Sequence, residues 1–277
     1  MKKYPVVLSI AGSDCSGGAG IQADLKTISA LGAYAATAIT AITVQNTMGV
    51  HAIHAIPPEI VKGQIEAVMD DLMPDAIKIG MINDIKIARV IAQAILKYKP
   101  EHVVFDPVMV STSGCKLIDD DAIDVLTKEL MPLTDLITPN LNEADVLCST
   151  SICNLEEMKQ AASELLRFGS KAVLLKGGHL KGDDMYDVLQ LKEEHIHYIY
   201  KGRNIASKNV HGTGCTLSSC IATFLAFGLP MQEAVRHAKN YIEGAIEAGK
   251  DIQIGHGNGP LNHLYNPQKM HIIKQNE

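Results

Sequence analysis

The chain has 277 residues, of which 47% are hydrophobic, and 25 Lys and Arg face 31 Asp and Glu for a formal net charge of −6. This length and apolar content predict one domain, residues 1–277, around a sizeable core. The acidic balance and the lack of a basic run argue against nucleic-acid binding. The longest apolar stretches, such as 33–44, are too short and too often interrupted to span a membrane, so we expect a cytoplasmic protein. The six cysteines form no C-x-x-C pair and are expected to be free thiols.

Short apolar or β-branched runs alternate along the chain with longer segments of helical periodicity. Between residues 155 and 168, for example, the apolar side chains fall on one helical face and the charged ones on the other. Such alternation predicts a mainly parallel sheet covered by helices on both faces, which binds ligands at the carboxyl ends of its strands. The strands are expected at 6–11, 35–44, 76–79, 102–105, 136–138 and 172–175.

The last third of the chain has a different pattern. Two segments of alternating polarity, 185–191 and 195–200, predict a β-hairpin at a sheet edge. Two helices are expected after it, at 216–227 and 231–248, on either side of Gly228-Leu229-Pro230. The polar tail beyond Pro267 is expected to be partly disordered.

A first glycine-rich segment, residues 11–24, lies between an expected strand and an expected helix, where glycine lets the backbone approach a ligand closely. A P-loop is excluded, because Gly18 and Ala19 stand where that motif needs Lys and then Ser or Thr. The pattern Gly18-x-Gly20-x-x-Ala23 fits a dinucleotide fingerprint, but the acidic residue expected about 20 positions later is missing. A tight turn that binds nothing is the simplest alternative.

A second glycine motif, His211-Gly212-Thr213-Gly214-Cys215, precedes an apolar helix. Free backbone amides at a helix start, together with a helix dipole worth about half a positive charge, predict an anion hole for a transferring phosphoryl group. The same field is expected to lower the pKa of the Cys215 thiol from about 8.5 toward neutrality. Cys215 is therefore a candidate base.

Two carboxylates, Asp106 and Glu143, follow neighbouring expected strands. Such a pair can hold a Mg²⁺ that bridges nucleotide phosphates. Each residue also has a structural explanation, because Asp before Pro is a common turn residue and Glu after Asn140 a common helix-start residue. Lys176, ahead of Gly177-Gly178, is a candidate to neutralise phosphate charge, and a solvated lysine is the alternative.

In order and spacing these motifs, with Gln45-Asn46-Thr47 and Lys78-Ile79-Gly80-Met81, resemble those of the hydroxymethylpyrimidine/phosphomethylpyrimidine kinases over about residues 5–262. The resemblance implies a ribokinase-like three-layer α/β/α sandwich with a mainly parallel central sheet and a small edge hairpin. It also implies a homodimer or similar assembly, and a kinase that uses ATP and Mg²⁺. The implied substrates are 4-amino-5-hydroxymethyl-2-methylpyrimidine and then its monophosphate, in thiamine biosynthesis.

The resemblance assigns roles to single residues. Gln45 suits an aminopyrimidine because its amide offers a donor and an acceptor side by side. Cys215 stands where many members of the superfamily carry Asp, and would act as a thiolate. The pyrimidine pocket would contain Gly12, Asp24, Val44, Gln45 and Met81; the metal site Asp106 and Glu143; the ATP-phosphate site Asn140, Lys176 and Thr213; and the transition-state site the amides of Gly212, Thr213, Gly214 and Cys215.

Three alternatives stay open. Pyridoxal kinase is the first, since pyridoxal is also a flat aza-aromatic with an exocyclic CH₂OH group. Cys115, within 111–116, would then be placed to add its thiol to the pyridoxal aldehyde from a loop over the site, or would be an ordinary packing cysteine. A non-catalytic binding module is disfavoured because Cys215 and Asp106 are both present, and a dinucleotide oxidoreductase because the fingerprint is incomplete. The nucleotide preference and the oligomer size are left undetermined.

Overall fold

A computed structural model describes residues 2–109, 120–178 and 184–274. Its main sheet has nine strands in the order β10-β9-β8-β7-β6-β5-β2-β3-β4. The six strands from β8 to β3 are parallel to one another, whereas β4, β9 and β10 run antiparallel to their neighbours. The predicted mainly parallel sheet with an edge hairpin is thus confirmed. The strands are β2 (Val6–Asp14), β3 (Tyr34–Asn46), β4 (Gly49–Ala55), β5 (Ala76–Ile79), β6 (His102–Phe105), β7 (Leu136–Ile137), β8 (Ala172–Lys176), β9 (Asp184–Leu191) and β10 (His197–Arg203).

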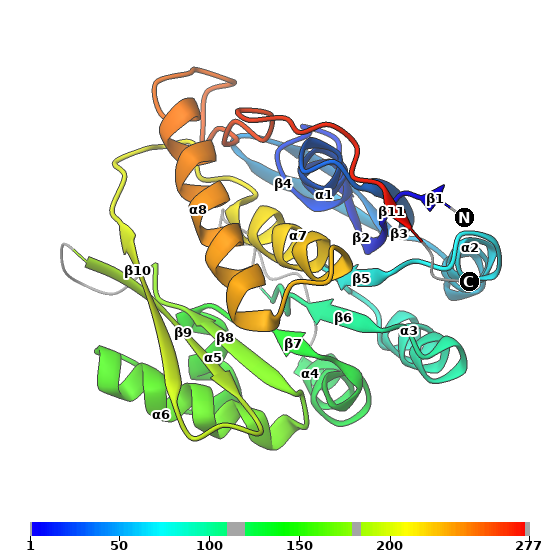
Figure 1. The fold of residues 1–277 in the computed structure, drawn as a ribbon, viewed down its shortest axis with the longest axis horizontal. Coiled ribbons are helices and arrows are strands. Elements are labelled where there is room, and N and C mark those ends of the chain that lie inside the picture. Colours follow the sequence, from blue (N-terminus) through cyan, green and yellow to red (C-terminus); the bar gives the residue numbers. More distant parts are fainter. Residues whose placement is uncertain (1, 110–119, 179–183, 275–277) are drawn as a thin grey trace.

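Helices cover both faces of this sheet and complete three layers (Figure 1). Successive side chains of a strand point to opposite faces, so Val7 of β2 joins one hydrophobic cluster and Leu8 the other. One face carries α1 (Gly20–Ala30), α7 (Thr213–Ala226) and α8 (Met231–Gly249); the other carries α2 (Pro58–Asp71), α3 (Ile85–Tyr98), α4 (Asp120–Val125), α5 (Leu141–Cys148) and α6 (Leu155–Leu165).

Several element boundaries differ from the prediction, and two of them lie in the glycine-rich segments. Strand β2 continues to Asp14, three residues further than expected. Helix α7 begins at Thr213 rather than at residue 216, so Gly214 and Cys215 belong to its first turn. The low helix propensity of glycine hid this start in the sequence. Strand β4 was not predicted, because its sequence is mostly small residues and histidine and it pairs only with β3.

The prediction of a partly disordered tail is wrong for the described residues up to 274. Gln268 donates its backbone N–H to the Ala30 carbonyl at 2.7 Å, and His271 donates to Gly32 at 2.7 Å. Strand β11 (Ile273–Lys274) then pairs with β1 (Lys2–Lys3). Gly32 has φ +87°, and a Cβ there would overlap the tail backbone at Lys269. The tail is therefore held by its backbone, which the polar composition does not reveal.

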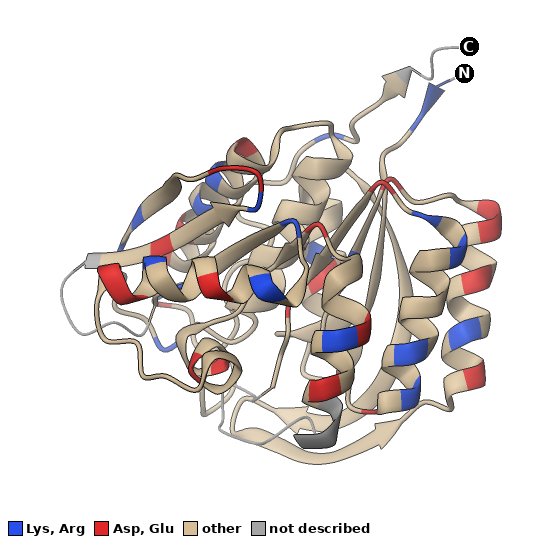
Figure 2. Cartoon of the chain, turned by 90° about the horizontal axis from the view of Figure 1, so that it is seen from below, with Lys and Arg blue, Asp and Glu red and all other residues tan. Residues whose placement is uncertain are grey.

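Charged residues of both signs are interspersed along the helices, as Figure 2 shows for one side of the molecule. In the part of the chain that the structure describes, no helix is both long and apolar enough to cross a membrane. Cys115 and the segment 111–116 lie outside the described residues. The prediction of free thiols is confirmed for Cys15, Cys148, Cys153, Cys215 and Cys220.

Candidate active site

The residues predicted for the site come together at the carboxyl ends of the parallel strands, as expected for this sheet type. Gln45 is the second-last residue of β3, and Lys176 ends β8. Asp106 directly follows β6, and Met81 follows β5 by two residues. The start of α7 lies against the same strand ends, because Gly214 is close to both Asp106 and Lys176.

One end of the site, the anion end, combines a lysine with the start of a helix. Lys176 donates from Nζ to Asp106 Oδ1 at 2.8 Å, and a Cβ on Gly214 would lie 3.3 Å from Asp106 Oδ2 and 3.5 Å from Lys176 Nζ. The ion pair thus touches the first turn of α7, where helix geometry leaves N–H groups without intrahelical acceptors. Gly212 caps this helix with φ +84°, and the Thr213 hydroxyl donates to the Val210 carbonyl at 2.6 Å.

The Lys176 side chain is not the solvated lysine considered as an alternative, since only 15% of it is exposed. Burial favours the neutral amine, but the carboxylates of Asp106 and Glu143 outweigh it and hold the pKa of Lys176 above its ordinary value. The Lys176 side chain is therefore protonated at neutral pH and places a positive charge beside the start of α7.

Asn140 and Glu143 form a capping box at the start of α5. Asn140 Oδ1 accepts from the Glu143 backbone N–H at 3.0 Å, and Glu143 Oε2 accepts from the Asn140 N–H at 2.7 Å. This is the structural role foreseen for Glu143, and it leaves Asn140 Nδ2 without a hydrogen-bond partner among the described residues. Burial raises the pKa of Glu143 to about 7; Asp106 adds to the rise, and Lys176 opposes it.

The two carboxylates fit a divalent cation, although they do not complete its shell. Asp106 is 1% exposed and Glu143 4%, and their repulsion would be relieved by a positive ion between them. Hard oxygen donors of this kind suit Mg²⁺, which usually takes its other ligands from phosphates and water. Among the residues described, no group of three or more His, Cys, Asp or Glu side chains is arranged to hold a metal alone.

The residues predicted for the pyrimidine pocket include Gly12 in β2, Gln45 in β3 and Met81 after β5. A Cβ on Gly12 would lie 3.1 Å from the Met81 sulfur, so this glycine leaves the room that Met81 occupies. The terminal amide of the half-buried Gln45 lies 3.1 Å from His211 Nε2. Val44 is 57% exposed and, one residue from Gln45 in a strand, faces the opposite side. The place of Val44 in the pyrimidine pocket stays a prediction.

Asp24, also predicted for the pyrimidine pocket, has several buried partners. Its side chain exposes no surface; Lys78 donates to both of its oxygens at 2.8 and 2.9 Å, and Ser219 donates to it at 2.7 Å. Ser9 donates a further hydrogen bond. Both carboxylate oxygens thus accept hydrogen bonds from protein groups, and a contact of Asp24 with a substrate stays a prediction.

Cys215 stands in the first turn of α7 and is half-buried. Burial raises its pKa to about 11; Asp24 and Asp106 contribute to the rise, whereas Lys78 and the backbone N–H of Gly20 lower it. The predicted fall in the Cys215 pKa is therefore wrong for the ligand-free chain. Removal from water and two nearby carboxylates outweigh the field of the helix start.

Sequence reasoning missed the role of two residues at this site, Asp14 and His211. Asp14 accepts hydrogen bonds from the Ser16 amide and hydroxyl, the amides of Gly18 and Ala19, and His211. Burial alone would raise the pKa of Asp14, but these bonds, led by that from His211, lower it to about 2. The amides of the first glycine segment thus turn inward to Asp14. Both residues stand in the motifs quoted above, but nothing in the sequence pairs them.

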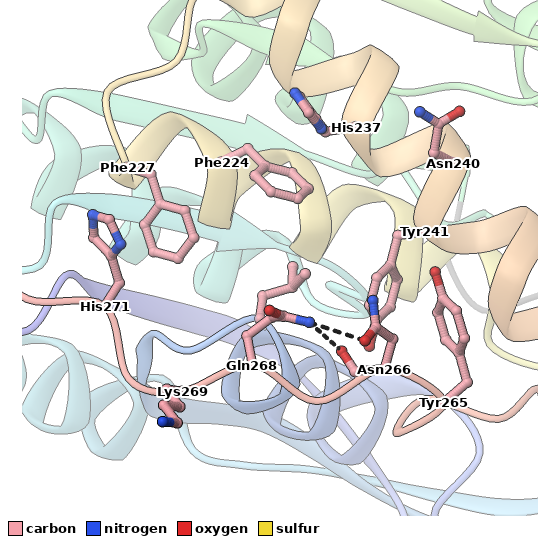
Figure 3. Close-up of a pocket in the computed structure, with 11 residues that line it drawn as sticks. Phe224, Phe227, His237, Asn240, Tyr241, Tyr265, Asn266, Gln268, Lys269 and His271 are labelled. Atoms are coloured by element: carbon pink, nitrogen blue, oxygen red, sulfur yellow. Dashed lines mark hydrogen bonds between the residues drawn. The ribbon is translucent and has the colours of Figure 1, made fainter.

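A separate hollow of about 470 Å³ lies between the far end of α7, α8 and the tail (Figure 3). Phe224, Phe227 and Tyr241 are among its lining residues, and no residue predicted for the site is. Phe224 is eleven residues beyond Thr213, roughly 16 Å along the helix at 1.5 Å per residue. The hollow is therefore not part of the strand-end site.

Comparison with known proteins agrees with this geometry. The model of the phosphomethylpyrimidine kinase family matches residues 14–262. The chain is 48% identical over 261 residues to the hydroxymethylpyrimidine/phosphomethylpyrimidine kinase of Rhizobium meliloti, covering 94% of this chain and 97% of that protein. Two other curated relatives, both named as bifunctional thiamine biosynthesis proteins, are about twice as long, and the chain spans 52% and 48% of them.

Solved structures give the same result. The crystal structure of phosphomethylpyrimidine kinase from Clostridium difficile has 46% sequence identity and a TM-score of 0.78, and covers 87% of this chain and 99% of that one. An ADP complex of Bacillus subtilis pyridoxal kinase has 33% identity and a TM-score of 0.87, and covers 94% and 98%. The incomplete dinucleotide fingerprint is thus no sign of an oxidoreductase, and the chain belongs to the phosphomethylpyrimidine kinase family within the ribokinase-like fold.

Proposed function

We propose that this protein transfers the γ-phosphoryl group of ATP first to 4-amino-5-hydroxymethyl-2-methylpyrimidine and then to the monophosphate, as a step of thiamine biosynthesis. The observation that carries the proposal is that the segment 211–215 at the start of α7 contacts two unlike groups of side chains. His211 lies 3.1 Å from the terminal amide of Gln45, and Gly214 lies against the Asp106–Lys176 pair.

The anion end suits the phosphates of the nucleotide. The first-turn amides of α7 and the Lys176 ammonium would stabilise the negative charge on the γ-phosphoryl group during its transfer. Asn140 offers its unengaged Nδ2 as a further donor. Asp106 and Glu143 would hold Mg²⁺, which neutralises charge on the β and γ phosphates when it is bound. The ADP complex of the Bacillus subtilis relative supports an adenine nucleotide here.

The acceptor end suits a flat heteroaromatic alcohol. Met81 offers an apolar, polarizable contact to a ring face, and Gln45 offers two polar atoms to its edge. Cys215 would take the proton of the hydroxyl as the bond to phosphorus forms. Since its pKa lies near 11 in the free chain, the thiol starts protonated at neutral pH, and the base role requires the Lys78 charge and the Gly20 amide to stabilise the thiolate.

The experiment is a coupled ADP-release assay that compares hydroxymethylpyrimidine, its monophosphate and pyridoxal with ATP and Mg²⁺. We expect turnover of both pyrimidines at a higher kcat/KM than for pyridoxal, and none once EDTA has removed the metal. A clear preference for pyridoxal would overturn the proposal in favour of the pyridoxal kinase alternative. The homodimer expected from the family resemblance and the cytoplasmic location expected from the short apolar stretches belong to the same proposal. Light scattering tests the homodimer.

A further inference from the structure

Three side chains from distant parts of the chain form one hydrogen-bonded array at the acceptor end of the site. His211 Nε2 lies 2.9 Å from Asp14 Oδ2 and 3.1 Å from the terminal amide of Gln45. Asp14 is 2% exposed and His211 8%, so water competes little for these bonds. Gly18 packs against the imidazole, because a Cβ at that position would lie 2.5 Å from His211 Cδ2. The ring is therefore held in one place.

The array determines where His211 carries a proton. An ionised carboxylate can only accept hydrogen bonds, and the pKa of Asp14, lowered to about 2, keeps it ionised at neutral pH. The 2.9 Å contact then requires an N–H at His211 Nε2, whether the ring is neutral or charged. A nitrogen that donates to Asp14 has no lone pair left for an amide nitrogen. The atom of Gln45 nearest His211 must therefore be the amide oxygen, which shares the single Nε2 hydrogen with Asp14 in a three-centre hydrogen bond.

The second neighbour of the Gln45 amide requires the same orientation. Thr43 Oγ1 lies 2.9 Å from the Ser13 carbonyl oxygen and 3.2 Å from the other terminal atom of Gln45. Its single hydrogen points to the carbonyl, which can only accept, so a lone pair of Thr43 faces Gln45 and needs a donor. The two ends of an amide have nearly the same shape, and the hydrogen-bond network decides between them. Here two independent neighbours place the NH₂ group toward Thr43.

We propose that His211, held by Asp14, is a positioning residue that fixes the orientation of the Gln45 amide. The amide oxygen then points toward His211 and the NH₂ group toward Thr43. This orientation determines which edge atoms of the substrate ring must donate a hydrogen bond to Gln45 and which must accept one. The inference rests on the proposed function. Each end of the amide keeps one more hydrogen-bonding position, so an acceptor and a donor remain side by side. The exocyclic amine of the substrate would donate on the His211 side, and the adjacent ring nitrogen would accept on the Thr43 side. A ring with a carbonyl in place of the amine would meet the Gln45 oxygen acceptor to acceptor.

The proton on His211 can be measured without any turnover. Two-bond ¹H–¹⁵N correlation spectra of the full-length protein labelled with [¹⁵N]histidine distinguish protonated from unprotonated ring nitrogens, and the signals lost in His211→Gln identify this residue. We expect a protonated Nε2 at pH 7. An unprotonated Nε2 would overturn the inference, because His211 would then accept from Gln45 instead.

Substrate preference tests the consequence. The substrates are the 4-amino compound and its 4-oxo analogue, and the variants are His211→Leu, which lacks a donor, and His211→Gln, whose amide can donate to both Asp14 and Gln45. In His211→Leu we expect KM for the 4-amino compound to rise about tenfold or more, the effect of one lost hydrogen bond, with a smaller change in kcat. The preference for the amine should fall by a similar factor. His211→Gln should keep that preference.

The matched control is His102→Leu, at the start of β6 and hence at the opposite end of the sheet, where neither constant should change. Equal losses for both substrates in His211→Leu, with the preference intact, would mean that His211 only supports the fold, and the inference would be rejected. A wild-type protein that does not phosphorylate the pyrimidine at all would instead reject the proposed function. In that case the NMR result still decides the orientation of the array.

Discussion

Lys78 and Asp24 form an ion pair in which neither side chain exposes any surface, with Nζ 2.8 and 2.9 Å from the two carboxylate oxygens. Lys78 comes from β5 and Asp24 from α1, and the Ser219 hydroxyl of α7 donates to the same carboxylate at 2.7 Å. One buried carboxylate therefore joins a central strand to both helices that begin at the site.

Removing one partner of this pair should destabilise the fold strongly. Lys78→Met leaves a buried carboxylate without its counter-charge, and we expect a loss of about 3–5 kcal/mol in the free energy of unfolding. The double variant Lys78→Met/Asp24→Asn, which removes both charges, should be more stable than the single variant. Urea unfolding of the wild type, Lys78→Met, Asp24→Asn and the double variant measures this. Simple addition of the two single effects would show that the charges are not coupled.

The Cys215 thiol should react slowly with alkylating agents in the absence of ligands. Only the thiolate reacts. With a pKa of about 11, the thiolate fraction of Cys215 rises about tenfold per pH unit between pH 8 and 10. Iodoacetamide labelling followed by mass spectrometry of the Cys215 peptide should show this slope. A labelling rate that levels off near pH 8 would contradict the raised pKa and support the lowered pKa expected from the helix start alone.

Cys215→Ala should separate the two phosphorylations. The alcohol gains from a base, an effect on the order of 10²–10⁴ in rate, whereas the monophosphate, with a second pKa near 6, is already ionised. The anion hole is backbone and should survive the change. We expect a much larger loss for the alcohol in single-turnover measurements. Equal losses would indicate that Cys215 shapes the site and does not act as a base.

Glu143→Gln should change the dependence of stability on pH. A carboxyl group whose pKa rises from 4.5 to about 7 on folding stabilises the fold fully below pH 4.5, and this contribution is lost as the pH rises through 7. Glutamine keeps an oxygen for the Asn140 amide but does not ionise. Relative to wild type, the variant should therefore gain stability on the order of 1–3 kcal/mol between pH 5 and 8, measured by urea unfolding in EDTA. A constant difference across this range would contradict the raised pKa.

Two glycines with nearly the same φ allow the cost of a positive φ to be measured separately from the cost of a steric overlap. Gly212 and Gly228 have φ values of +84° and +83°, but a Cβ on Gly212 would overlap the Gly18 carbonyl, whereas one on Gly228 meets nothing within 4 Å. Gly228→Ala should cost about 1 kcal/mol and leave turnover unchanged. Gly212→Ala should cost more and also lower kcat, because it pushes the first glycine segment away from α7. Thermal unfolding and ADP release measure both effects.

Much of the fold could be predicted because the sheet interior requires apolar runs. The strands at 76–79 and 102–105 have the predicted bounds. The edge hairpin is also present, with strands at 184–191 and 197–203 against the predicted 185–191 and 195–200. Strand β4 and the tail could not be predicted, since backbone hydrogen bonds hold them and their side chains carry no periodic signal.

For the site, the sequence identified the residue types but not their partners. Asp106, Lys176 and the start of α7 meet as expected, because parallel strands end at one edge. The pairing of Asp14 with His211 joins residues 197 positions apart, which no local pattern records. The raised Cys215 pKa depends on burial and on Asp24 and Asp106, neither of which adjoins it in sequence.

The pairing of β1 with β11 brings the first and last strands of the chain side by side (Figure 1). Topologically the fold is therefore close to a ring. A short linker from one end to the other, with new ends opened in the exposed turn at 192–196 between β9 and β10, would give a circular permutant with every strand neighbour retained. Such a permutant would carry fused partners at the hairpin edge of the sheet instead of beside α1.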